Sequence, residues 1–188
     1  HVIHRRQRQM CIRDSMKNGI EEFVRNSQLD IQELDLGKDF DDAAKAHEII
    51  MNGSIANSLM NYYQTDKSNL HPFTVKRIEA GIPVSASDYV SAIEQAKKME
   101  QILKQFFKKY DAIITPAAPG QAPRDLMNTG NAIFNGYWTM MGVPAISLPF
   151  LKGKDDLPIG IQFIANWSED LKLLEICKYV LEKEKLAN

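Results

Sequence analysis

The sequence has little cysteine and no long apolar segment. Cys11 and Cys177 are the only cysteines among its 188 residues, and they lie far apart in the chain. A disulfide framework or a zinc site needs more of them, so a reducing, cytoplasmic environment is expected. No apolar run approaches the roughly 20 residues of a membrane helix, and no hydrophobic signal core follows the basic N-terminus. We therefore expect a cytoplasmic protein without a membrane partner.

The sequence also lacks an excess of charge of either sign. Its formal net charge is −1, with 25% charged and 44% hydrophobic residues, which is ordinary for a globular protein. A near-neutral chain gives no electrostatic reason to expect a nucleic acid as partner. The length suffices for a domain with a real core, because a chain of about 150 residues buries roughly 70% of its unfolded surface.

Residues 1–15 (HVIHRRQRQMCIRDS) differ in composition from the rest of the chain. Four of the seven arginines lie there. A basic arm for RNA, an organellar address and a disordered tail all fit that composition. The stretch RQRQMCIRDS also resembles translated sequencing-adaptor sequence, which recurs at the ends of assembled environmental reading frames. We therefore predict that residues 1–15 are a non-native leader, adaptor-derived or disordered, and that residues 16–188 form a partial α/β domain.

The segment from Met16 to Tyr110 shows mostly the apolar spacing of helices. Residues 31–36 (IQELDL) alternate apolar and polar side chains, which is typical of a strand. Ser85 or Ser87 is suited to cap a long helix, with Asp88 in its first turn. The helices expected in this segment cover residues around 20–24, 40–63, 70–83 and 85–107.

Beyond Tyr110 the pattern changes to short strands. Residues 112–115 (AIIT), 144–150 (PAISLPF) and 158–165 (PIGIQFIA) are short, largely apolar runs, which suit strands covered on both faces. A loop and a short helix are expected between the first two. Ser168 is suited to cap a last helix, whose predicted buried stripe is Leu171, Leu174, Cys177, Val180 and Leu181. The expected fold is α/β, with strands joined by helices.

No standard catalytic arrangement is complete in this sequence. His47 and Glu48 lack the second histidine of a zinc-protease helix, and Gly53-Ser54 lacks the glycines of a nucleophile elbow. Neither a phosphate-binding loop nor a dinucleotide fingerprint occurs. Asp155 and Asp156 are most simply solvated charges of a turn. We therefore assign no catalytic residue, no metal site and no cofactor.

Prolines at strand ends give the only geometric signal for a site. Pro116 and Pro119 are expected to stop the 112–115 strand, because proline cannot donate to a sheet ladder. Pro144 and Pro149 flank the next strand in the same way. Ligand crevices form where loops diverge at strand ends. Trp138 lies between these two strand edges in sequence, and the residues alone leave pocket and core equally open for it.

Three phrases together resemble the C-terminal part of the amidase signature family. They are YDAIITPAAPG (110–120), FNGYWTMMGVPAISLPF (134–150) and DLPIGIQFIA (156–165), in family order and with family-like spacing. The resemblance extends from about residue 16 to the C-terminus. It implies the C-terminal portion of an α/β/α sandwich, in which helices flank a mixed β-sheet.

The resemblance also implies hydrolysis of a small-molecule amide through an acyl-enzyme. The family uses a serine nucleophile, a second serine in a cis peptide, a lysine base and a Gly/Ser-rich loop, all in its N-terminal half. This chain has no Ser-Ser pair and no such loop, so it is expected to be inactive alone, and a homodimer is a candidate assembly. The residues that the resemblance places at the substrate pocket are Thr115, Pro116, Ala117, Phe134, Asn135, Trp138 and Thr139.

Two other interpretations stay open. Glutaminase subunits of tRNA-dependent amidotransferases belong to the same family, but they carry an aspartate ten residues before the glycine that matches Gly142. Ala132 occupies that position here, which disfavours this interpretation unless Asp125 substitutes. A stand-alone, non-catalytic binding module is the third hypothesis. It is disfavoured because a partial sheet would expose strand edges and apolar faces.

Overall fold

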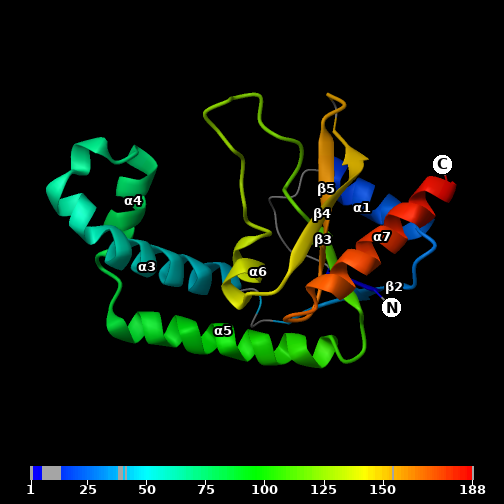
Figure 1. The fold of residues 1–188 in the computed structure, drawn as a ribbon, viewed down its shortest axis with the longest axis horizontal. Helices are drawn as coiled ribbons and strands as arrows, with labels where there is room; N and C mark the ends of the chain where they lie inside the picture. The colour runs from blue at the N-terminus through cyan, green and yellow to red at the C-terminus, as the bar shows by residue number, and fades with distance from the viewer. Residues whose placement is uncertain (1, 6–13, 38–39, 41, 154, 188) are drawn as a thin grey trace. The chain divides into compact units, whose positions relative to one another are not determined.

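The computed structural model describes residues 2–5, 14–37, 40, 42–153 and 155–187, with side chains described from Met16 to Glu184 within these ranges. The chain divides into two compact units, which are described separately. One comprises residues 1–36 and 101–188, and the other residues 37–100. Figure 1 shows the elements along the chain.

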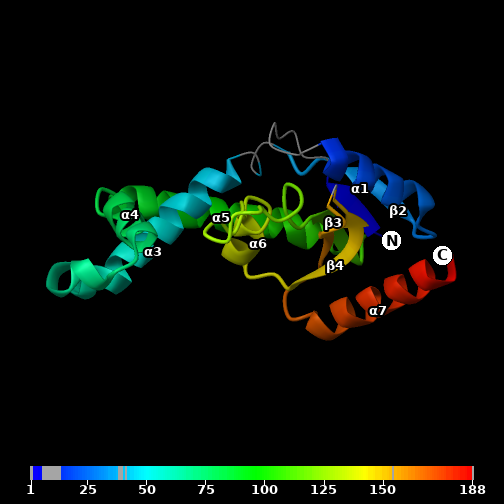
Figure 2. The same cartoon turned by 90° about the horizontal axis from the view of Figure 1, so that it is seen from above.

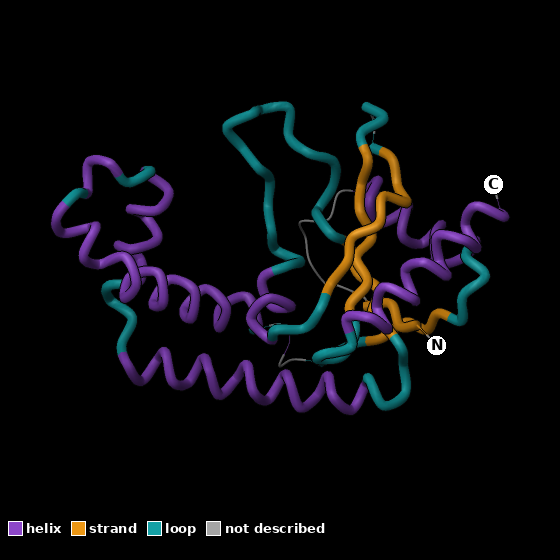
Figure 3. Tube along the Cα trace, in the orientation of Figure 1, coloured by secondary structure: helices purple, strands orange, loops and turns teal. Residues whose placement is uncertain are grey.

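The first unit is built on a five-stranded mixed sheet with the order β2-β1-β3-β5-β4. The two β1 pairings are parallel, whereas β5 runs antiparallel to both of its neighbours. This confirms the predicted mixed sheet, and Figure 3 shows its strands in orange. The strands are β1 (Val2–Arg5), β2 (Ile31–Leu34), β3 (Ala112–Pro116), β4 (Ala145–Lys152) and β5 (Pro158–Ile164).

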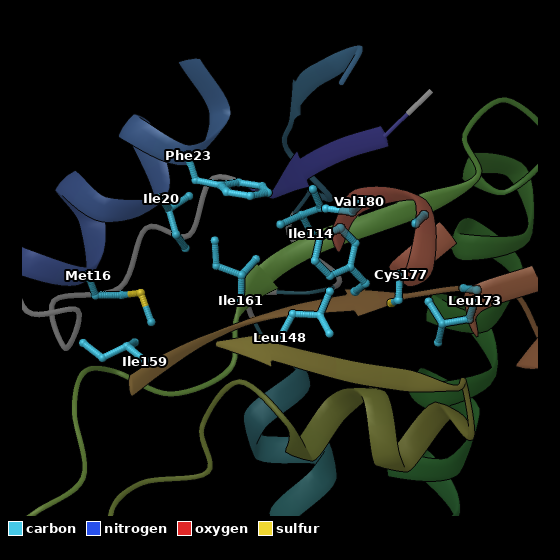
Figure 4. Close-up of a cluster of buried hydrophobic side chains, with 13 residues drawn as sticks. Met16, Ile20, Phe23, Ile114, Leu148, Ile159, Ile161, Leu173, Cys177 and Val180 are labelled. Carbon is cyan, nitrogen blue, oxygen red and sulfur yellow. The ribbon is translucent and has the colours of Figure 1, made fainter. Parts of the chain in front are cut away.

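Two helices cover one face of this sheet. They are α1 (Asp14–Asn26) and α7 (Asp170–Ala187), and Figures 1 and 2 show both on the same side of the strands. Their apolar side chains meet those of β3, β4 and β5 in one buried cluster, shown in Figure 4. Its members from the two helices are Met16, Ile20, Phe23, Leu173, Cys177 and Val180.

The predicted stripe of α7 is wrong in its first half. Leu171 and Leu174 are 77% and 54% exposed, whereas Leu173 is buried with Cys177 and Val180. Residues 173, 177 and 180 follow the i, i+4, i+7 spacing of one helix face. The sequence therefore also fits a buried stripe on this face, which does not include Leu171. The helix also begins at Asp170, two residues after the predicted cap Ser168.

The predicted coverage of β4 is wrong as well. Residues of β3 are buried throughout, as an apolar run predicts. In β4 the burial alternates instead, with Ala145, Ser147 and Pro149 exposed and Leu148 buried. The strand lies at the edge of the described sheet and is irregular between Leu148 and Leu151, a place where a sheet tolerates proline.

The second unit contains helices only. α3 (Ala43–Thr65) and α4 (Pro72–Gly81) are joined by a short 3-10 turn (Lys67–Asn69), and α5 (Ala86–Phe106) begins in this unit. Ser85 caps α5 as predicted. Its hydroxyl accepts from the Asp88 N–H (3.0 Å) and donates to the Asp88 carboxylate (2.6 Å), which fixes the start of the helix.

Residues 1–15 are described only in part. Val2–Arg5 form β1, which pairs with β2 and β3, and α1 begins at Asp14. Residues 6–13 lie outside the described residues. Whether residues 1–15 are native stays a prediction. Within the described part of the chain, no helix combines the length and the apolarity that a membrane crossing requires.

Candidate active-site wall

The end of β3 is linked to its neighbours by a buried hydrogen-bond network. Thr115 and Gln162 face each other across the β3–β5 pairing, and both are at least 96% buried. The Gln162 side-chain amide donates one hydrogen to Thr115 Oγ1 (2.8 Å) and the other to the Phe134 carbonyl (3.0 Å). A single buried side chain therefore joins the strand end to the segment that precedes α6.

The short helix α6 (Gly136–Met141) is held against the same strand end. Asn135 directly precedes it, and its side-chain amide donates to the Ala117 carbonyl (3.2 Å). The Ala117 N–H in turn donates to the Gly160 carbonyl (3.0 Å), which continues the ladder one residue beyond β3. Pro116 therefore does not stop the pairing, because its carbonyl and its neighbour's N–H remain available to β5.

The two large aromatic residues of the predicted site are packed inside. Phe134 is 0% and Trp138 1% exposed, and the Trp138 ring meets Tyr137 edge-on at 4.9 Å between centroids. Trp138 Nε1 has no acceptor among the described residues. Thr139 is exposed on α6, and Asn135 is half-buried. The surface of this wall is thus formed by Ala117, Asn135 and Thr139, with the aromatic rings behind it.

The seven predicted site residues come together around one strand end. Thr115, Pro116 and Ala117 close β3, while Phe134 and Asn135 reach them through the network described above. Trp138 and Thr139 follow on α6. Their role in substrate binding stays a prediction. Nothing in the sequence pattern singles out Gln162, whose only signal is one polar side chain inside the apolar run 158–165.

The loop between β3 and α6 is anchored to the turn that joins β4 and β5. Asp155 accepts from the Gln121 amide (2.6 Å) and forms an ion pair with Arg124 (2.6 Å). Asp156, in contrast, is an exposed carboxylate of the turn, and it forms an ion pair with Lys152 at 3.3 Å. The prediction of a simple solvated charge is wrong for Asp155, because its partners lie about thirty residues away in sequence. The anchor fixes where the loop leaves the strand end.

A second candidate site lies within residues 37–100. A groove of about 620 Å³ runs between α3 and the segment from Gly81 to Val90. Ser54 and Tyr89 hydroxyls meet there at 3.0 Å. The residues that line the groove include no His, Lys, Asp or Glu, so the serine has no base to remove its proton. This arrangement supports no acyl transfer.

His47 has a perturbed acidity in this second unit. Burial, and then the nearby Arg77 guanidinium, lower the pKa of the imidazole from its ordinary value of 6.5. Between the pKa of His47 in the folded protein and 6.5, the unfolded chain binds more protons than the folded chain. The free energy of unfolding of this unit therefore falls as the pH drops through that window.

We expect the NMR titration midpoint of His47 to lie below 6.5. Replacing the cation with a neutral side chain (Arg77→Gln) should move this midpoint upward, while burial keeps it below 6.5. A His47 midpoint at or above 6.5 in the unsubstituted protein would contradict the burial argument.

Comparisons with known proteins agree with this architecture. A model of the amidase family matches residues 34–174. The chain is 34% identical over 125 residues to a glutamyl-tRNA(Gln) amidotransferase subunit of Aliarcobacter butzleri, covering 61% of this chain and 28% of that protein. It is 35% identical over 98 residues to the fatty acid amide hydrolase of Medicago truncatula, covering 45% and 16%.

The fold also matches solved amidase structures. The crystal structure of an amidase superimposes with a TM-score of 0.79 at 17% identity, over 93% of this chain and 44% of that chain. An amidase-type hydrolase fold is defined by three observations. They are the mixed sheet, the helices on its face, and the family match over three quarters of the sequence. The chain belongs to the amidase signature family. It spans less than a third of the length of the two curated relatives.

Proposed function

We propose that this chain is the C-terminal part of an amidase that hydrolyses a carboxylic amide to an acid and ammonia or an amine. The observation that supports this most directly is the family match over residues 34–174. In this proposal Thr115, Ala117 and Asn135, which lie around one strand end, form part of the pocket wall. A neutral amide suits this wall, because its accessible residues Ala117, Asn135 and Thr139 carry no charge. The aromatic lining expected from the sequence is not at the surface, because Phe134 and Trp138 are buried.

The chemistry requires groups that this chain does not contain. In the family, a serine hydroxyl attacks the amide carbon, the C–N bond breaks, and the amine leaves with a proton. Water then hydrolyses the acyl-enzyme to release the acid. A serine performs this attack only when a positioned base accepts its proton and backbone N–H groups stabilise the oxyanion. The chain therefore supplies the substrate wall and is inactive alone.

The test compares the 188-residue chain with its genomic extension. The DNA upstream of the Met16 codon is sequenced, and both polypeptides are assayed for release of ammonia or amine from aliphatic amides, anilides and glutamine. We expect no hydrolysis by the chain. An in-frame extension that encodes a lysine, a Ser-Ser pair and a Gly/Ser-rich loop should hydrolyse at least one amide. A stop codon directly upstream, or an extended protein inactive on every amide, would contradict the proposal.

A glutaminase subunit of a tRNA-dependent amidotransferase is the second candidate. The 34% identity to the Aliarcobacter butzleri protein favours it. Against it, Ala132 stands where those subunits carry an aspartate, and Asp125 lies exposed with one carboxylate oxygen accepting from the Met127 N–H (2.9 Å). Preference of the extended protein for glutamine over uncharged amides, lost on Asp125→Asn, would support this candidate over the first.

A further inference from the structure

The segment between β3 and α6, residues 118–133, is a loop whose two ends lie together. The side-chain amide of Asn135, just after the loop, donates to the carbonyl of Ala117, just before it (3.2 Å). Compact surface loops of about 6–16 residues with neighbouring ends frequently carry function. Figures 1 and 3 show this loop leaving β3 and returning to α6. Both of its ends therefore lie at the candidate pocket wall.

The tip of this loop exposes two large apolar side chains. Leu126 is 98% and Met127 87% exposed, more than any other large hydrophobic residue in the part of the chain that the structure describes. Asp125 orders the backbone there, because its carboxylate accepts from the Met127 N–H (2.9 Å). Apolar side chains held in water gain free energy when another surface covers them. The tip is therefore suited to cover an apolar group.

The pocket wall lacks the apolar surface that the tip offers. Its accessible residues are Ala117, Asn135 and Thr139, whereas the rings of Phe134 and Trp138 are buried. Small-molecule pockets are lined mostly by apolar side chains, with a few polar groups that fix the orientation of the ligand. An uncharged amide on this wall therefore needs apolar contacts from a further segment. The loop that begins and ends at the wall carries such side chains.

A polar contact at the surface holds the loop in its described position. Among the described residues, the hydrogen bonds of the loop to distant parts of the sequence all end on Asp155. Gln121 donates to this carboxylate (2.6 Å), and Arg124 forms an ion pair with it (2.6 Å). We call these three residues the Asp155 latch. The Arg124 side chain is 81% exposed, and exposed ion pairs contribute little stability and are screened by salt. The latch can therefore open while the sheet stays folded.

The two limbs of the loop lie against each other near its tip. A Cβ at Gly130 would be 3.5 Å from Cδ of Pro123, so residues 123–130 are able to move as one piece. Hinges are a few loop residues that absorb a change in backbone angles, and they are often small. Gly120 directly precedes the latch on the limb that leaves β3. It is the hinge that this arrangement offers.

We propose that residues 123–130 are a lid for the candidate pocket wall. When the Asp155 latch opens, the lid turns about Gly120 and places Leu126 and Met127 over the wall. There the two side chains contact the uncharged part of a bound amide and exclude water from it. This rests on the proposed function for the identity of the ligand. The tip then selects amides by the apolar group that they carry.

The test measures how often the tip reaches the wall. Met127→Cys and Thr139→Cys are combined in the full chain in a Cys11→Ser background, and the rate of intramolecular disulfide formation in a glutathione buffer is followed. A disulfide forms only when the two Cα atoms come within about 7 Å. Cys177 contributes little background, because its burial raises the pKa of the thiol to about 11. The matched control pairs Met127→Cys with Glu175→Cys, at an exposed position of α7.

The tip–wall pair should form its disulfide at least about tenfold faster than the control pair, because only the wall lies within reach of the lid. Adding Asp155→Asn should raise this rate at least about threefold, since the open state is then more populated. Arg124→Gln should act in the same direction, and so should added sodium chloride. A tip–wall rate equal to that of the control pair overturns the lid. A rate that neither latch variant changes overturns the role of the latch.

Contact with an amide is measured in the same chain without the cysteine substitutions. Methionine methyl groups are labelled with carbon-13, and the Met127 signal is assigned from its absence in Met127→Leu. Acetanilide should shift the Met127 signal and leave that of the buried Met16 unchanged. A Met127 signal that does not respond to acetanilide overturns the contact between the tip and the amide.

The lid and the proposed function fail through different readouts. Hydrolysis of amides by the extended protein, with no tip–wall disulfide above the control, contradicts the lid only. A lid that closes in this chain, while the extended protein hydrolyses no amide, contradicts the proposed function only.

Discussion

Replacing Gln162 with leucine is expected to lower the free energy of unfolding by about 2–4 kcal/mol. The Gln162 amide donates to Thr115 Oγ1 and to the Phe134 carbonyl, and all three groups lie in the buried interior. Leucine fills a similar volume but leaves both acceptors without their donor. A buried polar group without a partner costs roughly 1–3 kcal/mol. Urea denaturation followed by circular dichroism measures the change.

The control for this variant is the same substitution at an exposed glutamine. Gln105 lies on α5 and accepts from Lys108 at the surface (2.9 Å), so Gln105→Leu should change stability by less than about 0.5 kcal/mol. Adding Thr115→Val to Gln162→Leu should cost less than the sum of the single changes, because the valine removes one of the orphaned acceptors. A loss below about 0.5 kcal/mol for Gln162→Leu would show that the network does not stabilise the strand end.

Replacing Gly81 with alanine is expected to destabilise residues 37–100 by about 3 kcal/mol, the upper range for overpacking. A Cβ at position 81 would overlap the Asn52 carbonyl oxygen and lie 2.7 Å from Ala56 Cβ. The first contact is with backbone of α3, which cannot rotate away. Alanine is the better helix former by about 1 kcal/mol, so the expected loss runs against the local propensity.

Gly53→Ala provides the matched comparison on the partner helix. A Cβ at position 53 would approach the Tyr89 ring at 3.0 Å, and that side chain is able to shift. We expect a change within about 1 kcal/mol for Gly53→Ala, since the propensity gain offsets the contact. Limited proteolysis of residues 37–100 together with urea denaturation reports both variants. Equal stability of Gly81→Ala and the parent protein would mean that α3 and α4 are not in close contact there.

Some features of the candidate site are predictable from neighbouring residues, whereas others depend on residues far away in the chain. Asn135 and Trp138 stay predictions that follow from the family pattern of residues 134–150. The Ser85 cap is predictable from the sequence because a cap needs only its own turn. The local sequence does not mark Gln162, because its partners Thr115 and Phe134 are 47 and 28 residues away. The prediction for Asp155 is wrong for the same reason, since Arg124 and Gln121 reach it from another loop.

Burial faces were the other source of error. The predicted α7 stripe begins with Leu171 and Leu174, whereas the buried row is Leu173, Cys177 and Val180. Apolar residues occupy more than one face of this helix, so periodicity alone does not choose between them. In β4 the sequence predicted two covered faces, and the described structure covers one.

Neighbouring residues suffice to predict most elements, their order and the family, because helix periodicity, apolar runs and caps are local. The exception is β1 (Val2–Arg5), which lies in the predicted leader. Three further features are visible only in the folded protein: the parallel pairings of β1, the face that α1 and α7 cover, and the partners of Gln162 and Asp155. These features join residues far apart in the chain. Their free energy comes from burial and hydrogen bonds that exist only after folding.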